Sequence, residues 1–144
     1  MPLSPPMSGA RRTAHLRWTG EGLAFRGRGG DGPEVIIDGD SREGPAPMEA
    51  LLLSLAGCMG VDVVAILEKS RVPLESLEVE VEGERRPEPP ERYTRIRILF
   101  RVEGPKEEHT PRVERAIHLS VEKYCSVFHS LREDIAFETK LERA

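Results

Sequence analysis

Apolar and polar positions alternate in three short segments of the N-terminal third of the chain. Residues Thr13–Thr19 and Gly22–Arg28 are predicted strands, joined by a Gly-Glu-Gly turn that supplies the backbone freedom a hairpin needs. Residues Pro33–Asp38, with Val-Ile-Ile at their centre, predict a third strand. A loop rich in glycine and proline follows.

The spacing of apolar residues becomes helical from Pro47 to about Arg71. Pro47 suits a first helical position, and the negative charge of Glu49 complements the positive end of the helix dipole. The stretch Ala50–Met59 is apolar on nearly every face. It is too short, and too interrupted by glycine, to span a membrane. Since such a helix has to be enclosed on every face, we expect a second subunit to cover it.

Alternation with period two returns after Pro73. Residues 77–82 alternate Leu or Val with Glu, and residues 95–102 alternate Arg with large apolar side chains, apart from Leu99. A proline-rich loop at residues 87–90 joins these segments. The pattern predicts a hairpin with an acidic and a basic strand on its outer side.

The last third predicts two helices and a strand. Residues Thr110–Tyr124 form the first helix with Thr110 as N-cap, residues 126–132 a short second one, and residues 135–141 a final strand. The main element order is β-β-β-α-β-β-α-β, which indicates an α+β fold. We expect a flexible leader over residues 1–12 and a single domain over residues 13–144.

Composition narrows the functional classes. A net charge of −4 with 32% charged residues, and the lack of a basic stripe, argue against nucleic acid as partner. The chain has no Asn or Gln, and all but four of its 21 basic residues are Arg, which fits a heat-adapted source or a GC-rich genome. We see no secretion signal and expect a cytoplasmic protein, in which two cysteines are more often catalytic or buried than a structural disulfide.

Cys58 lies between Gly57 and Gly60 in the apolar helix. A small buried hydrophobe is one interpretation. However, glycine weakens a helix interior by up to about 1 kcal/mol, so its presence here favours close approach by a ligand or a second helix. Asp62, four positions later, shares the face of Cys58 and would oppose thiolate formation there.

Cys125 precedes the predicted short helix. At the positive end of that helix its pKa would be low; alternatively, it is a boundary residue tucked under the helix end. His129 is a conceivable general base or, with Cys125, a metal ligand, but no third ligand is clustered nearby. We therefore expect neither a metal nor a cofactor.

The segments 47–64 and 122–127 resemble the OsmC/Ohr family (osmotically inducible protein C and organic hydroperoxide resistance proteins), and most closely its YhfA-like branch. The element order agrees over nearly the whole chain. The resemblance implies an intertwined homodimer, with long central helices enclosed between β-sheets. It also implies thiol peroxidase chemistry, in which Cys58 reduces a small organic hydroperoxide and Cys125 resolves the sulfenic acid as a disulfide. A dithiol reductant would then restore both thiols.

Two supporting positions differ from the family pattern. Met48 stands where the family has a glutamate, and Glu49, one place later, is our third candidate catalytic residue after Cys58 and Cys125. The family arginine has no matched counterpart, although Arg17, Arg26 and Arg28 are near in sequence. The alternative function is a non-enzymatic ligand-binding or redox-responsive dimer of the same fold.

Overall fold

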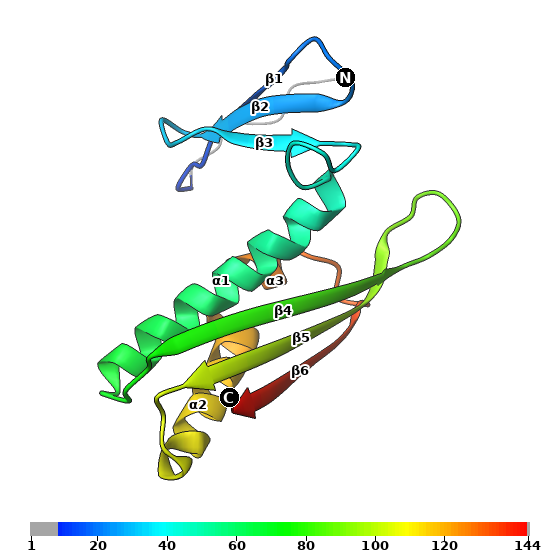
Figure 1. Ribbon diagram of the computed structural model, residues 1–144. Helices are drawn as coiled ribbons and strands as arrows, with labels where there is room; N and C mark the ends of the chain where they lie inside the picture. The colour runs from blue at the N-terminus through cyan, green and yellow to red at the C-terminus, as the bar shows by residue number, and fades with distance from the viewer. Residues whose placement is uncertain (1–8, 144) are drawn as a thin grey trace. The chain divides into compact units, whose positions relative to one another are not determined.

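The computed structural model describes residues 9–143, so most of the expected leader lies outside the described residues. The chain divides into two compact units, residues 1–50 and 51–144. Its α+β architecture, with two sheets and a long helix, confirms the predicted fold class. The units are described separately below, and Figure 1 labels their elements.

The first unit contains an antiparallel sheet in the order β1-β2-β3 (Figure 1). Its strands are β1 (Ala14–Trp18), β2 (Ala24–Gly29) and β3 (Val35–Asp38), within two residues of the predicted ends. Among the described residues of this unit, only a glycine and an aspartate are buried. Leu16, Trp18, Leu23 and Val35 are each more than half exposed. This sheet therefore has no apolar core of its own.

Helix α1 (Pro47–Lys69) begins at the predicted proline. Its first turn is capped by Glu49, whose Oε1 accepts hydrogen bonds from the Ala46 N–H at 2.9 Å and the Ser41 hydroxyl at 2.7 Å. These bonds satisfy a backbone donor at the helix start, as in a capping box. They also hold the pKa of the Glu49 carboxyl below its usual value.

One face of α1 is buried within the single chain. It carries Leu55, Met59, Val63 and Leu67, at most 1% exposed, whereas Leu53, Val61 and Val64 are 43–68% exposed. By length and composition, α1 is the one described helix that could cross a membrane. The candidate span is the whole helix, because the apolar pattern continues beyond the shorter stretch Ala50–Met59. Core helices pass the same test, and the buried face is that of a core helix.

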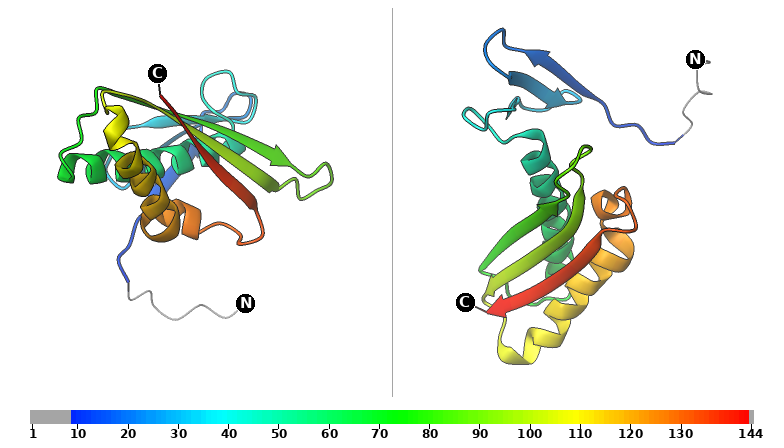
Figure 2. Two further views of the ribbon diagram at one scale, coloured as in Figure 1. Left: turned by 90° about the horizontal axis from the view of Figure 1, so that it is seen from below. Right: turned by 90° about the vertical axis from the view of Figure 1, so that its right-hand side faces the viewer.

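The second unit contains the sheet β4-β5-β6, with β4 (Ser76–Arg85) antiparallel and β6 (Ala136–Arg143) parallel to the central β5 (Tyr93–Glu103). Helices α1 and α2 lie on the same side of this sheet (Figure 2). The β5 side chains that point toward them are almost completely buried: Ile96, Ile98, Phe100 and Val102. The opposite side is charged as predicted, and Arg101 of β5 bridges to Glu80 of β4 at 3.1 Å.

The segment between β5 and β6 differs most from the prediction. The expected continuous helix over Thr110–Tyr124 is divided into α2 (Thr110–Leu119) and the π-helical turn η2 (Ser120–Tyr124). It is preceded by the 3₁₀ turn η1 (Glu107–His109) and followed by α3 (Ser126–His129). The N-cap of α2 is His109 rather than Thr110, because a 3₁₀ turn precedes the helix. Cys125 lies at the junction of η2 and α3.

Candidate active site

Cys58 is a half-buried thiol on α1, one turn before Asp62. The two glycines beside it are not required by neighbours within the chain. A Cβ at Gly57 would meet nothing within 4 Å, and one at Gly60 would make an ordinary 3.7 Å contact with Val79. The space beside Gly57 is therefore open to a group from outside the chain, as expected for a ligand or a second helix.

Cys125 is completely buried. Its backbone N–H donates to the Ser120 carbonyl at 2.8 Å, and its sulfur accepts a hydrogen bond from the Phe128 N–H at 3.4 Å. The sulfur is thus the N-cap group of α3. Both interpretations from the sequence apply in part, since Cys125 is a buried boundary residue at a helix start.

The two thiols meet in the fold, and both are free. The Cys58 side chain lies close enough to Cys125 to raise the pKa of the Cys125 thiol. The interaction brings the two cysteine motifs together in one site within the second unit.

The expectation of a low pKa for Cys125 is wrong. Burial, the largest cause, raises the pKa of Cys125 to about 12, and the charges of Cys58 and Asp62 raise it further. The Phe128 N–H lowers it, as the helix start should, but this effect is smaller than that of burial. At neutral pH Cys125 is therefore a protonated thiol.

Asp62 and Ser120 complete the polar part of the site. The Ser120 hydroxyl, with no exposed surface, donates to Asp62 Oδ2 at 2.8 Å. The sequence pattern placed Asp62 on the helical face of Cys58 but did not single out Ser120. The one indication of Ser120 was a serine at a position of the predicted helix where an apolar residue is expected, five residues before Cys125. Its meaning depends on the π-helical turn, which the sequence pattern did not predict.

The remaining candidate residues belong to the first unit or are engaged in other hydrogen bonds and ion pairs. Glu49 caps α1 in the first unit, and its catalytic role stays a prediction. Arg26 pairs with Glu34 at 2.8 Å. His129 Nε2 lies 2.9 Å from the Val121 carbonyl oxygen and donates a hydrogen bond to it. This nitrogen is therefore not free to act as a base. No group of three or more His, Cys, Asp or Glu side chains suited to a metal occurs among residues 9–143.

A hollow of about 300 Å³ is lined partly by apolar side chains and partly by His129, Arg132 and Glu133. Its lining includes Leu55, one turn before Cys58 on α1, and Phe128, whose N–H contacts the sulfur of Cys125. Ile96, Ile135 and Phe137 provide further apolar surface. A hollow of this kind accommodates an alkyl or aryl group better than water.

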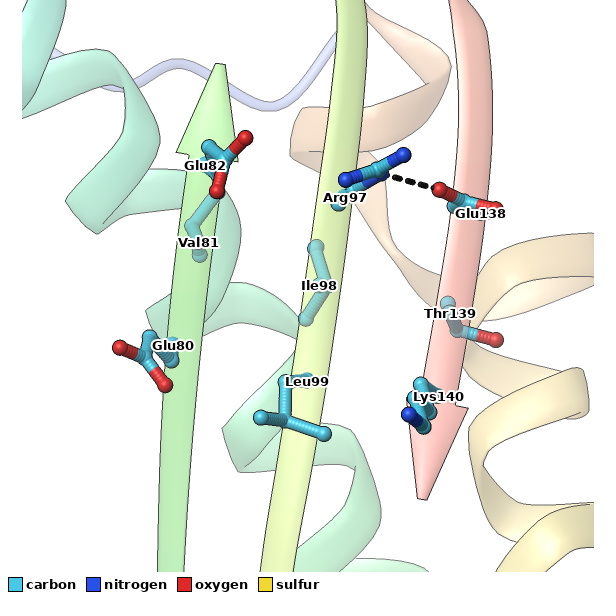
Figure 3. A pocket seen from close by; sticks show the side chains of 9 residues that line it. All are labelled: Glu80, Val81, Glu82, Arg97, Ile98, Leu99, Glu138, Thr139 and Lys140. Atoms are coloured by element: carbon cyan, nitrogen blue, oxygen red, sulfur yellow. Dashed lines mark hydrogen bonds and ion pairs between the residues drawn. The ribbon is translucent and has the colours of Figure 1, made fainter. Parts of the chain in front are cut away.

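A second hollow, of about 650 Å³, lies on the charged outer side of the β4-β5-β6 sheet (Figure 3). It is lined by side chains of both signs, and Arg97 forms an ion pair with Glu138 across it. Neither hollow is lined by a thiol, so we place the candidate chemistry at the cysteine pair itself.

Residues 38–140, which include both cysteines, match the family model of OsmC-like proteins. The chain belongs to the OsmC/Ohr family. Protein YhfA of Escherichia coli K12 is 42% identical over 115 residues, which cover 79% of this chain and 84% of YhfA. A hypothetical protein from Aquifex aeolicus has a TM-score of 0.82 at 29% identity, covering 94% of this chain and 98% of that one.

The fold of this chain is also similar to that of the organic hydroperoxide resistance protein OhrB of Bacillus subtilis. The TM-score is 0.60 at 14% identity, and the match covers 92% of this chain and 98% of OhrB. At this identity the likeness concerns the fold. Family membership, together with two free thiols in contact, supports a redox role for the chain.

Proposed function

We propose that this OsmC/Ohr protein is a cysteine-based thiol peroxidase that reduces small organic hydroperoxides in defence against oxidative stress. The observation that carries the proposal is the proximity of Cys58 to Cys125, which raises the pKa of the Cys125 thiol. A sulfenic acid formed on either sulfur would lie within reach of the other thiol. The printed name of the OhrB structure, an organic hydroperoxide resistance protein, agrees with this substrate class.

The burial of the two thiols supports their proposed roles. Cys58 is half-buried and open to a substrate, whereas Cys125 is fully buried and protonated. The Cys58 thiolate attacks one oxygen of the hydroperoxide, and the O–O bond breaks. The products are a sulfenic acid on Cys58 and an alcohol, whose oxygen takes up a proton.

The resolving step uses Cys125. Its thiol loses a proton and attacks the Cys58 sulfur, and the sulfenic oxygen leaves as water. The resulting disulfide is reduced by an external dithiol, which is itself oxidised to a disulfide. That reductant reaches Cys58 first because Cys125 has no exposed surface. The dependence on reduced thiols is consistent with the cytoplasmic location that we propose.

We further propose that the active form is a homodimer. Leu53, Val61 and Val64 expose apolar surface on α1, and the open side of Gly57 lies on the same helical face. The β1-β2-β3 sheet exposes large apolar side chains and lacks a core. Apolar surface of this extent on two elements is typical of a subunit interface.

Coupled turnover with cumene hydroperoxide and a dithiol tests the peroxidase proposal. The wild type should consume the hydroperoxide catalytically, and Cys58→Ser should not. Equal and slow consumption by both proteins would refute the proposal.

A second candidate function is ligand binding by a non-enzymatic dimer. The partly apolar hollow lined by Leu55 and Phe128 favours it. The capping role of Glu49 also favours it, because the carboxylate is already engaged at the helix start. Native mass spectrometry after incubation with acyl or alkyl compounds separates the candidates. A ligand-binding protein would retain such a compound in both the wild type and Cys58→Ser, without hydroperoxide turnover.

A further inference from the structure

The bond between Asp62 and Ser120 joins the two elements that carry the thiols. Asp62 lies one turn after Cys58 on α1, and Ser120 begins the π-helical turn that ends at Cys125. The hydroxyl–carboxylate distance is 2.8 Å, and Ser120 has no exposed surface. A buried hydroxyl without a partner would be costly, so this bond favours one arrangement of the two elements.

The backbone of the π-helical turn depends on the same serine. In a regular α-helix the Cys125 N–H would bond to the carbonyl of Val121. Here it bonds to the Ser120 carbonyl, five residues back, and the Val121 carbonyl accepts from His129 Nε2 instead. Ser120 therefore holds α1 with its hydroxyl and the Cys125 backbone with its carbonyl.

We propose that Ser120 and Asp62 are positioning residues for the resolving thiol: Ser120 anchors the turn that presents Cys125 to Cys58, and the Asp62 carboxylate delays the reaction of Cys125. The inference rests on the proposed function in assigning Cys125 as the resolving thiol. Neither residue exchanges atoms with the substrate, and both act through Cys125.

The effect of Asp62 follows from its charge. Its carboxylate raises the pKa of Cys125, as does Cys58, the other ionisable group of α1 that acts on this thiol. On the neighbouring turns, His129 is bonded to the Val121 carbonyl, and Glu122 and Lys123 are exposed. Ile96 of β5 and Phe137 of β6, which line the same hollow as Phe128 of α3, are apolar. Arg132 and Glu133 of the following loop also line this hollow.

The resolving step can be observed without a peroxide, by using dipyridyl disulfide as the oxidant. The Cys58 thiolate attacks one sulfur of the reagent, forms a mixed disulfide and releases one thiopyridone. Cys125 then loses its proton, attacks the Cys58 sulfur and releases a second thiopyridone. The rate of the second release measures resolution. Cys125→Ser should release only one thiopyridone.

The two substitutions should change the second rate in opposite directions at neutral pH. Ser120→Ala removes the anchor but keeps the charge, so it should slow the second release about tenfold or more, since small displacements of reacting groups are costly. Ser120→Thr keeps the hydroxyl and should restore most of the rate. Asp62→Asn keeps an acceptor for Ser120 but removes the charge, so it should accelerate the second release.

Glu122→Gln is the matched control, because it removes an exposed carboxylate from the same turn and should leave the second rate unchanged. A wild-type rate in Ser120→Ala would overturn the inference. So would an unchanged or slower rate in Asp62→Asn, the result expected of a merely structural role. If Ser120→Ala does not fold, the direction of the Asp62→Asn change decides alone.

The test separates this inference from the proposed function. A wild type that releases two thiopyridones but does not consume cumene hydroperoxide would refute the peroxidase proposal only. A wild type that consumes the hydroperoxide, with Ser120→Ala and Asp62→Asn both at wild-type second rates, would refute only the positioning roles.

Discussion

The thiol of Cys125 is buried and lies close to Cys58, although Cys58 is on α1 and Cys125 is at the junction of η2 and α3. Burial and contact have opposite consequences for chemistry. The contact makes a disulfide accessible, whereas burial keeps Cys125 protonated and removes it from direct attack by solutes. The site therefore has one thiol that meets reagents and one that reacts only with its neighbour.

Alkylation should distinguish the two thiols. In the folded reduced protein, iodoacetamide should modify Cys58 first, and Cys125 should react about 100-fold more slowly, because its sulfur is buried and protonated. Peptide mass spectrometry over a time course measures both rates. After unfolding in urea the two rates should converge, which serves as the control. Faster alkylation of Cys125 than of Cys58 in the folded protein would reverse the roles assigned here.

The stability of the protein should depend on the proton of Cys125. Because the folded-state pKa of this thiol is raised to about 12, its contribution to stability is complete below the unfolded thiol's pKa and is lost as pH rises through about 12. Urea unfolding at about pH 7 and about pH 11 should show a larger loss of stability for the wild type than for Cys125→Ser, since serine does not ionise in this range. Equal losses would contradict the raised pKa.

Glu49 should stabilise α1 through its cap. Glu49→Ala removes the acceptor for Ala46 and Ser41 and should lower the free energy of unfolding. Glu49→Gln keeps an acceptor oxygen and should recover part of that loss. Thermal unfolding of both variants, alongside turnover with cumene hydroperoxide, separates capping from catalysis. If Glu49→Gln is stable but inactive, the predicted catalytic role gains support; full activity in both variants would remove it.

The exposed face of α1 should mediate assembly. Val61→Lys places a charge in the apolar stripe and should convert the proposed dimer to monomers, as measured by light scattering with size-exclusion chromatography. Lys69→Glu, at the polar end of the same helix, is the control and should leave assembly unchanged. A Val61→Lys protein that assembles like the wild type would place the interface elsewhere.

The sequence predicted those parts of the fold that depend on local patterns. Pro47 marked the start of α1 because proline suits a first helical turn, and strict alternation located β4 and β5. The cysteine motifs identified the family, which made Cys58 and Cys125 candidate partners before any distance was available.

The features that the sequence did not predict depend on tertiary structure. The π-helical turn at Ser120 needs one unusual backbone bond, and apolar periodicity does not report it. The pKa of Cys125 was predicted in the wrong direction, because a helix start is visible in the sequence whereas burial is not.

Intact mass spectrometry of the reduced protein after one equivalent of cumene hydroperoxide tests the central claim most directly. The account predicts that each chain loses both thiols together as one internal disulfide, that Cys125→Ser accumulates a sulfenic acid on residue 58, and that Cys58→Ser is unchanged. A wild-type chain that retains both free thiols, or accumulates sulfenic acid on Cys58 without forming the disulfide, would contradict it.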